Sequence, residues 1–190
     1  MKKLNLVLVF FILAATLLAG ADKFFVSAGA ALALPSDSRY RDFYGTVQFS
    51  PELTVGYRFF KSFYAWLGYH FFSASYAVPD LLDKTSGMQH SLALGAGWET
   101  RRGRRLQSDF FAAMILAGVR EKGLGAAIAD SALGFEFGTS LRYFFTAKVF
   151  LALAVSYSQA NISLQATESG LAGEYMLGGL RLGTRLGIRF

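Results

Sequence analysis

The chain has 190 residues, no cysteine and a formal net charge of +6. Its length suits one domain, and the lack of cysteine excludes a disulfide framework and a thiolate metal site. Its hydrophobic content of 53% and its mean hydropathy of +0.35 are high for a soluble domain, in which about 45–50% of residues are apolar. Composition alone therefore predicts contact with lipid.

The first 21 residues have the composition of an export signal. Two lysines precede an apolar stretch, Leu6–Leu18, and a small-residue cleavage site, Ala19–Ala21. We predict a signal peptide over 1–21 and a mature domain over 22–190. Without the two lysines the net charge falls from +6 to +4 (19 basic residues less 2, against 13 acidic), too small an excess to indicate nucleic-acid binding. The alternative is an uncleaved anchor helix, although the apolar run is short of the roughly 20 residues that cross a bilayer.

Alternation with a period of two residues recurs through the rest of the chain. The longest later apolar run, Phe110–Val119, is too short for a membrane-spanning helix. Segments of alternating hydrophobicity bounded by turn residues are typical of membrane β-barrel strands. Eight such segments occur: Phe24–Leu34, Pro51–Phe59, Phe63–Ser73, Met88–Glu99, Leu106–Gly118, Ser131–Tyr143, Val149–Tyr157 and Leu180–Phe190. They predict an all-β fold, an eight-stranded antiparallel up-and-down transmembrane β-barrel that follows a cleaved signal peptide.

The last segment shows the alternation most plainly. One parity carries Leu180, Leu182, Leu186, Ile188 and Phe190, and the other carries Arg181, Arg185 and Arg189. A soluble strand would turn its apolar parity inward and its charges toward water. We predict the reverse here, with the apolar parity against lipid and the arginines inside the barrel.

The connections between segments alternate in length. Three are short: Phe60–Ser62, Thr100–Arg105 and Phe144–Lys148. Four are long: Pro35–Gln48, Ala74–Gly87, Arg120–Asp130 and Gln159–Gly173. Bacterial outer-membrane barrels have short periplasmic turns and long outer loops. This pattern predicts that both termini are periplasmic and that four loops face outward, where an extracellular or envelope partner would bind.

The inner parity carries both signs of charge. An eight-stranded barrel is just wide enough for side chains to fill, and buried charges require partners. We predict an ion-pair network in the lumen, made by Glu52, Arg58, Glu99, Asp109, Glu136, Arg142, Arg181, Arg185 and Arg189, with His70, Gln89 and Gln107 as uncharged partners. The position of each residue along its strand predicts two levels in the barrel. Near the turn end we expect Glu99, Asp109, Arg58, Arg142 and Arg189, and nearer mid-height we expect Glu136 and Arg185. The network is interpreted as a structural plug.

Aromatic residues concentrate at segment ends on the outer parity. This arrangement predicts a girdle at the membrane interface, formed by Tyr57, Phe59, Phe63, Trp98, Tyr143 and Tyr157, with Phe190, Tyr69 and His90 at similar positions. The alternative is that aromatic residues simply favour strands.

The export signal, the eight alternating segments and the terminal L-G-T-R-L-G-I-R-F together resemble the small eight-stranded outer-membrane barrels of the OmpA/OmpX type. The resemblance covers essentially the whole mature chain, through pattern more than through one diagnostic motif. It implies that Leu186, Ile188 and Phe190 form the signal read by the barrel-assembly machinery. It further implies a monomer in contact with outer-membrane lipids, in the outer membrane of a diderm bacterium.

The leading functional prediction is a non-enzymatic barrel that serves envelope integrity or surface interaction. A narrow channel for small solutes is one alternative. A lipid A-modifying enzyme is another, motivated by His90 and Ser91, but adjacent strand residues point to opposite faces and cannot pair directly. The sequence contains no H-E-x-x-H, G-x-S-x-G or P-loop motif, so no cofactor, metal site or nucleotide site is predicted.

Overall fold

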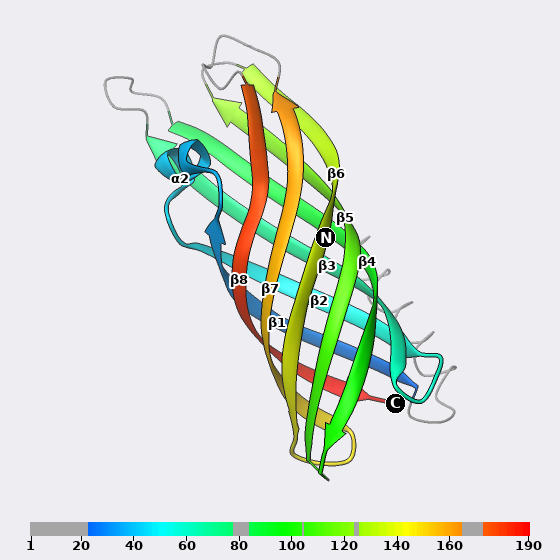
Figure 1. The fold of residues 1–190 in the computed structure, drawn as a ribbon. Helices are drawn as coiled ribbons and strands as arrows, with labels where there is room; N and C mark the ends of the chain where they lie inside the picture. The colour runs from blue at the N-terminus through cyan, green and yellow to red at the C-terminus, as the bar shows by residue number, and fades with distance from the viewer. Residues whose placement is uncertain (1–22, 78–83, 104, 124–125, 165–172) are drawn as a thin grey trace, which may run out of the picture.

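The computed structural model describes residues 23–77, 84–103, 105–123, 126–164 and 173–190. The predicted signal peptide over 1–21 lies outside these residues. The described chain forms one closed barrel, with each strand beside its neighbours in sequence and β8 beside β1 (Figure 1). A short helix lies at one end of the barrel. No helix among the described residues is long and apolar enough to cross a membrane.

The elements follow one another without crossovers. They are β1 (Phe24–Pro35), α2 (Ser38–Tyr44), β2 (Gln48–Arg58), β3 (Phe63–Ala77), β4 (Lys84–Arg102), β5 (Leu106–Gly123), β6 (Ala126–Phe144), β7 (Val149–Leu164) and β8 (Gly173–Arg189). All eight strand pairs are antiparallel. The predicted fold class, an all-β eight-stranded antiparallel up-and-down barrel, is confirmed.

The two terminal strands close the barrel. Their register runs from Phe25 opposite Arg189 to Pro35 opposite Gly179. Beyond it, Phe190 N donates to Phe24 O at 2.8 Å, and Phe24 N donates to Phe190 O at 3.3 Å. Each strand is therefore paired on both sides over part of its length, whereas the loop-end extensions of β3, β6 and β8 each pair with one neighbour.

The alternation along each strand separates an apolar exterior from a polar and aromatic interior. On the outer face, Leu94 is 66% exposed, Met114 is 66% exposed and Leu133 is 69% exposed. Inward neighbours such as Asp109 and Glu136 are buried. Large aliphatic side chains left this exposed would be costly in water, because burying each one contributes roughly 1.5–3 kcal/mol. The exterior therefore has the chemistry of a surface solvated by lipid.

The predicted extent of three long connections is wrong. Within the segments predicted as loops, the described stretches Ala74–Ala77, Lys84–Gly87, Arg120–Gly123, Ala126–Asp130 and Gln159–Leu164 belong to strands. The strands continue there without a regular apolar alternation. That alternation arises only where one face meets lipid, whereas the hydrogen-bonded ladder extends past that level.

The remaining long connection, Pro35–Gln48, contains the helix α2. Asp37 caps it, since Asp37 Oδ1 accepts a hydrogen bond from Tyr40 N at 3.3 Å. The other Asp37 oxygen accepts from Met176 N at 3.1 Å, which ties the helix to β8. Tyr40 is buried, and its hydroxyl donates to Gln89 Oε1 at 3.2 Å. The helix is thereby fixed at the loop end of the barrel.

Candidate functional site

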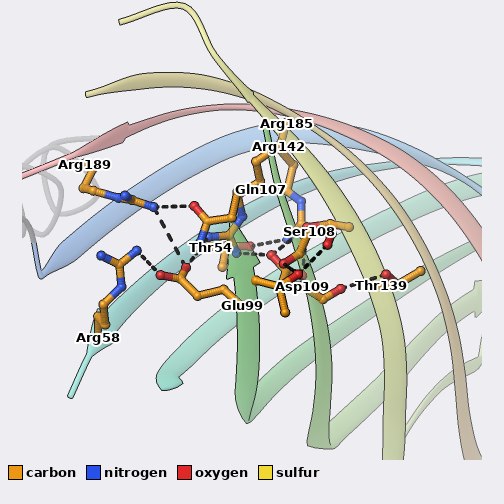
Figure 2. A network of polar contacts seen from close by, with 12 residues as sticks. Thr54, Arg58, Glu99, Gln107, Ser108, Asp109, Thr139, Arg142, Arg185 and Arg189 are labelled. Atoms are coloured by element: carbon orange, nitrogen blue, oxygen red, sulfur yellow. Dashed lines mark hydrogen bonds and ion pairs between the residues drawn. The ribbon is translucent and has the colours of Figure 1, made fainter. Parts of the chain in front are cut away.

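The lumen contains a group of charges near the short turns, which we name the turn-end group: Arg58, Glu99, Asp109, Arg142 and Arg189. Arg142 joins both carboxylates, with Nη2 at 2.6 Å from Asp109 Oδ2 and Nη1 at 3.6 Å from Glu99 Oε2. Arg58 forms an ion pair with the other oxygen of Glu99, and Arg189 Nη2 lies 3.9 Å from Glu99 Oε2. These side chains point toward one another from five different strands (Figure 2).

Neutral polar side chains add hydrogen bonds to this group. Ser140 Oγ lies 2.9 Å from each carboxylate oxygen of Asp109, and the Asp109 side chain is fully enclosed. Gln107 Oε1 accepts from Arg189 Nη2 at 2.9 Å. Satisfying the remaining lone pairs in this way is what makes buried charge tolerable.

Aromatic rings surround the central arginine of the turn-end group. The guanidinium carbon of Arg142 lies 4.8 Å from the ring centroid of Phe25, 5.1 Å from that of Tyr64 and 5.6 Å from that of Phe150. Ring faces attract a cation, more strongly when water is excluded. Arg142 is therefore held by ion pairs with carboxylates and by contacts with aromatic rings. Its planar guanidinium suits both kinds of contact.

A second group, which we name the mid-barrel group, consists of Glu52, His70, Glu136, Arg181 and Arg185. Arg181 bridges two strands, with Nη2 at 2.9 Å from Glu52 Oε2 and Nη1 at 3.4 Å from Glu136 Oε1. Arg185 Nε lies 3.3 Å from the second oxygen of Glu52. Two arginines thus face two carboxylates. Each of the nine charges predicted for the lumen has a partner of opposite sign, distributed between these two groups.

His70 occupies the centre of the mid-barrel group as a hydrogen-bonding side chain. Its Nδ1 lies 2.6 Å from Arg181 Nη2. Arginine has only donors, so Nδ1 is assigned as the acceptor, which leaves the ring proton on Nε2. That nitrogen faces Glu136 Oε2 at 3.5 Å. The histidine is buried among charged neighbours and lines two of the small cavities of the lumen.

Inward glycines make room for the large lumen side chains. A Cβ added to Gly187 would lie 2.2 Å from the ring of Phe150, and one added to Gly97 would lie 2.3 Å from the ring of Tyr64. A Cβ at Gly183 would lie 3.0 Å from Glu52 Oε1. Glycine at these positions is therefore a packing requirement of the filled lumen.

Three small cavities lined by described residues lie along the lumen. One of about 10 Å³ lies in the mid-barrel group, and one of about 20 Å³ lies between the two groups. A third, of about 40 Å³, lies beneath Tyr40 and is lined by residues that include Gln48, Ser91 and Arg181. A cavity of about 10–15 Å³ is the size that holds one water molecule.

The predicted girdle residues lie on the barrel exterior. Tyr57, Phe59, Phe63, Trp98 and Tyr143 are all exposed, and Tyr157 is half-buried. Trp98 stacks on Phe110 with a centroid separation of 6.4 Å. Their interaction with a membrane interface stays a prediction. Leu186 and Ile188 of the predicted assembly signal are likewise exposed, while Phe190 is half-buried.

The structure separates the histidine and serine that motivated an enzymatic alternative. His90 lies on the exterior, where Nδ1 is 2.5 Å from the hydroxyl of Tyr69. Ser91 faces inward and lines the cavity beneath Tyr40. The two side chains therefore cannot act as a nucleophile and its base. Among the described residues, no group of three or more potential metal-ligating side chains could hold a metal ion.

Several residues of the lumen network were missed by sequence analysis. Ser140 and Thr54 form hydrogen bonds with Asp109 and Arg185, and Phe25 and Phe150 flank Arg142. Their inward parity was the only available signal. That signal does not indicate which of the many inward residues meets which charge.

No family model matches the sequence, and no curated protein matches it. Solved structures do. Neisserial surface protein A is 20% identical, with 88% of this chain and 97% of that chain covered and a TM-score of 0.64. The outer membrane protein OprG of Pseudomonas aeruginosa is 15% identical over 88% of this chain and 96% of that chain, with a TM-score of 0.65. Ail, the attachment invasion locus protein of Yersinia pestis, solved with the heparin analogue sucrose octasulfate, is 13% identical over 88% of this chain and 98% of that chain, with a TM-score of 0.54.

These likenesses extend over nearly the whole length of each compared protein, and at such low identities they establish architecture alone. The closed up-and-down order of the strands agrees with them. The resemblance stated from the sequence is confirmed at the level of the fold. This chain has the fold of the small eight-stranded outer-membrane β-barrels.

Proposed function

We propose that the protein is a non-enzymatic, monomeric barrel of the outer membrane of a diderm bacterium, with both termini in the periplasm. It spans the membrane as a sealed scaffold and presents four loops to the outside, where it serves envelope integrity or surface interaction. The observation that carries this proposal is the pairing of an apolar exterior with a lumen filled by ion pairs. Outer-membrane lipids and, during biogenesis, the barrel-assembly machinery are its proposed partners.

The filled lumen favours a scaffold over a channel. Arg142 and Arg181 each bridge two carboxylates that lie on other strands. The cavities of about 10 and 20 Å³ at these levels have the size of single water molecules. Passage of a solute would require both arginines to leave their partners, which is costly for buried charge.

The loop end is where a partner would bind. Binding residues concentrate on loops that a rigid scaffold holds in place, and the order of the strands brings four connections to that end. The helix α2 gives one of these connections a fixed shape, through the hydrogen bonds of Asp37 and Tyr40. A preorganised loop favours recognition because less conformational entropy is lost on binding.

The first expected result concerns folding and conductance. Purified protein refolded in detergent should give a β-rich circular dichroism spectrum and should migrate differently on a gel when unheated than when boiled. In planar bilayers it should show no discrete conductance steps. A helical spectrum or solubility without detergent would contradict the membrane barrel. Discrete conductance from a correctly folded sample would instead favour the channel.

The second expected result concerns Phe190. Replacing it with alanine keeps the backbone, and so keeps the two hydrogen bonds to Phe24 that close the barrel. Refolding in detergent should therefore be nearly unchanged, while the amount of barrel assembled in the outer membrane of cells should fall. The measurement is the heat-modifiable fraction in both settings. Equal assembly of Phe190→Ala and the native chain in cells would refute the proposed assembly signal.

A further inference from the structure

A polar row interrupts the apolar exterior at one level on three adjacent strands. Leu92, Leu116 and Leu133 lie opposite one another across β4, β5 and β6. One step closer to the loop end, the row consists of His90, Gly118 and Ser131, and the next row consists of Met88, Arg120 and Ala129. Directly opposed residues of an antiparallel pair project from the same face. A polar row therefore borders the leucine row.

His90 is held in place on this surface. The Tyr69 hydroxyl lies 2.5 Å from Nδ1, and the ring of Phe71 lies 5.1 Å from the imidazole ring. When Tyr69 donates to Nδ1, the ring proton is on Nε2, which is then available as a donor. This pair therefore gives the border of the apolar surface an oriented N–H group.

Beside His90 the surface has a gap. Gly118 is its cross-strand partner, and a Cβ added there would meet only the backbone oxygen of Asp130, at 3.8 Å. The glycine therefore leaves open space between His90 on one side and Ser131 on the other, with Leu116 below. We name this space the Gly118 notch.

Arg120 borders the notch on the loop side. It is exposed, and it lies diagonally from His90 across the β4 and β5 pair. Diagonal neighbours are about 7–8 Å apart, within reach of a long side chain. Asp130 also lies near the notch, but its carboxylate accepts from the backbone N of Ser131 at 2.7 Å and its parity is that of the lumen. Imidazole N–H, serine hydroxyl and guanidinium are all hydrogen-bond donors.

We propose that the Gly118 notch binds the phosphate of a membrane lipid, whose acyl chains lie along the leucine row below it. The inference rests on the proposed membrane location. The hydrogen-bond donors and the Arg120 cation bind the phosphate, and the adjacent row of leucines packs against the acyl chains of the lipid. Because a free phosphate ion lacks acyl chains, the site selects a lipid over that ion. A phosphate at this height marks the level at which the apolar exterior meets the headgroups.

The proposal is tested by native mass spectrometry of the detergent-solubilised full-length barrel. The probes are phosphatidic acid and diacylglycerol with identical acyl chains, and free inorganic phosphate serves as a third arm. The native chain should retain phosphatidic acid about tenfold more than diacylglycerol, as loss of charge-assisted hydrogen bonds would imply. It should retain no inorganic phosphate.

Two variants and two matched controls locate the binding. Arg120→Ala removes the cation, and Gly118→Leu fills the notch without removing a donor. Both should lower phosphatidic acid retention toward that of diacylglycerol. Arg41→Ala removes an arginine from α2, and Ala112→Leu enlarges an exposed residue elsewhere on β5; both should retain phosphatidic acid as the native chain does.

Equal retention of the two lipids by the native chain would overturn the proposal. So would undiminished retention by Gly118→Leu, or retention of inorganic phosphate equal to that of the lipid. Every sample is first checked for heat-modifiable migration. A native chain that lacks this migration would contradict the proposed membrane barrel itself, so the failure of the two proposals can be told apart.

Discussion

Arg142→Ala should destabilise the barrel by about 3–5 kcal/mol, the range for removing one member of a buried ion pair. The substitution leaves Asp109 without its 2.6 Å partner and removes one of the cations that face Glu99. It also empties the space between the rings of Phe25 and Phe150. Urea unfolding of the barrel reconstituted in lipid vesicles measures the difference.

The control for this variant is Arg105→Ala. Arg105 is exposed and donates to the Tyr143 hydroxyl at a long 3.4 Å, so its removal should change stability by less than about 0.5 kcal/mol. The double variant Arg142→Met with Asp109→Asn removes both charges and should cost less than Arg142→Ala alone. An Arg142→Ala barrel as stable as the native chain would show that the lumen charges are not coupled.

Leu94→Arg should destabilise the barrel by about 2–4 kcal/mol when it is folded in a bilayer, the range for arginine at the midplane of a lipid face. Leu94 is 66% exposed and lies in a row with Leu67, Met114 and Phe135 at the waist of the barrel. In a water-soluble protein, a charge at so exposed a position would be nearly neutral. The same vesicle unfolding experiment gives the value.

The matched control is Met88→Arg, six residues toward the loop end on the same strand and the same face. Arginine near the interface costs about 0–1 kcal/mol, so this variant should be close to native. Equal effects of the two substitutions would show that the exterior does not have the depth profile of a bilayer.

The fold could be predicted because its strongest signal is local. In β8, Leu180, Leu182, Leu186 and Ile188 lie on one parity and are exposed, while Arg181 and Arg189 on the other parity are buried. Burial in lipid on one face imposes this pattern on each strand separately. No knowledge of the neighbouring strand is needed to recognise it.

The ends of the strands could not be predicted because the apolar alternation stops before the strand pairing does. Beyond the leucine row of β4, β5 and β6 the exterior no longer requires apolar residues, yet pairing continues to Glu121 opposite Ile128 and further. Backbone hydrogen bonds hold these extensions, and backbone groups are the same for every sequence. The helix α2 did carry a local signal, the cap residue Asp37 three positions before Tyr40.

The ion pairs could be predicted as a set but not as partners. Arg181 meets Glu52 although 129 positions separate them and β1 lies between their strands. Such a contact depends on how strands are staggered around the barrel, because closure fixes the tilt and the shear together. Arg185 and Arg181 have the same parity, and the stagger brings both to Glu52.

The central claim, that the barrel turns its apolar face to lipid and packs its lumen, is tested most directly along β7. The chain has no cysteine, so single cysteines from Leu151 to Ser156 each carry one nitroxide label, and the inward residues of this segment are small. In vesicles, collision with oxygen should be high at Leu151, Leu153 and Val155 and low at the residues between them, and a water-soluble nickel complex should reach none of them. Accessibility without this period of two, or access of the nickel complex to Leu153, would contradict the account.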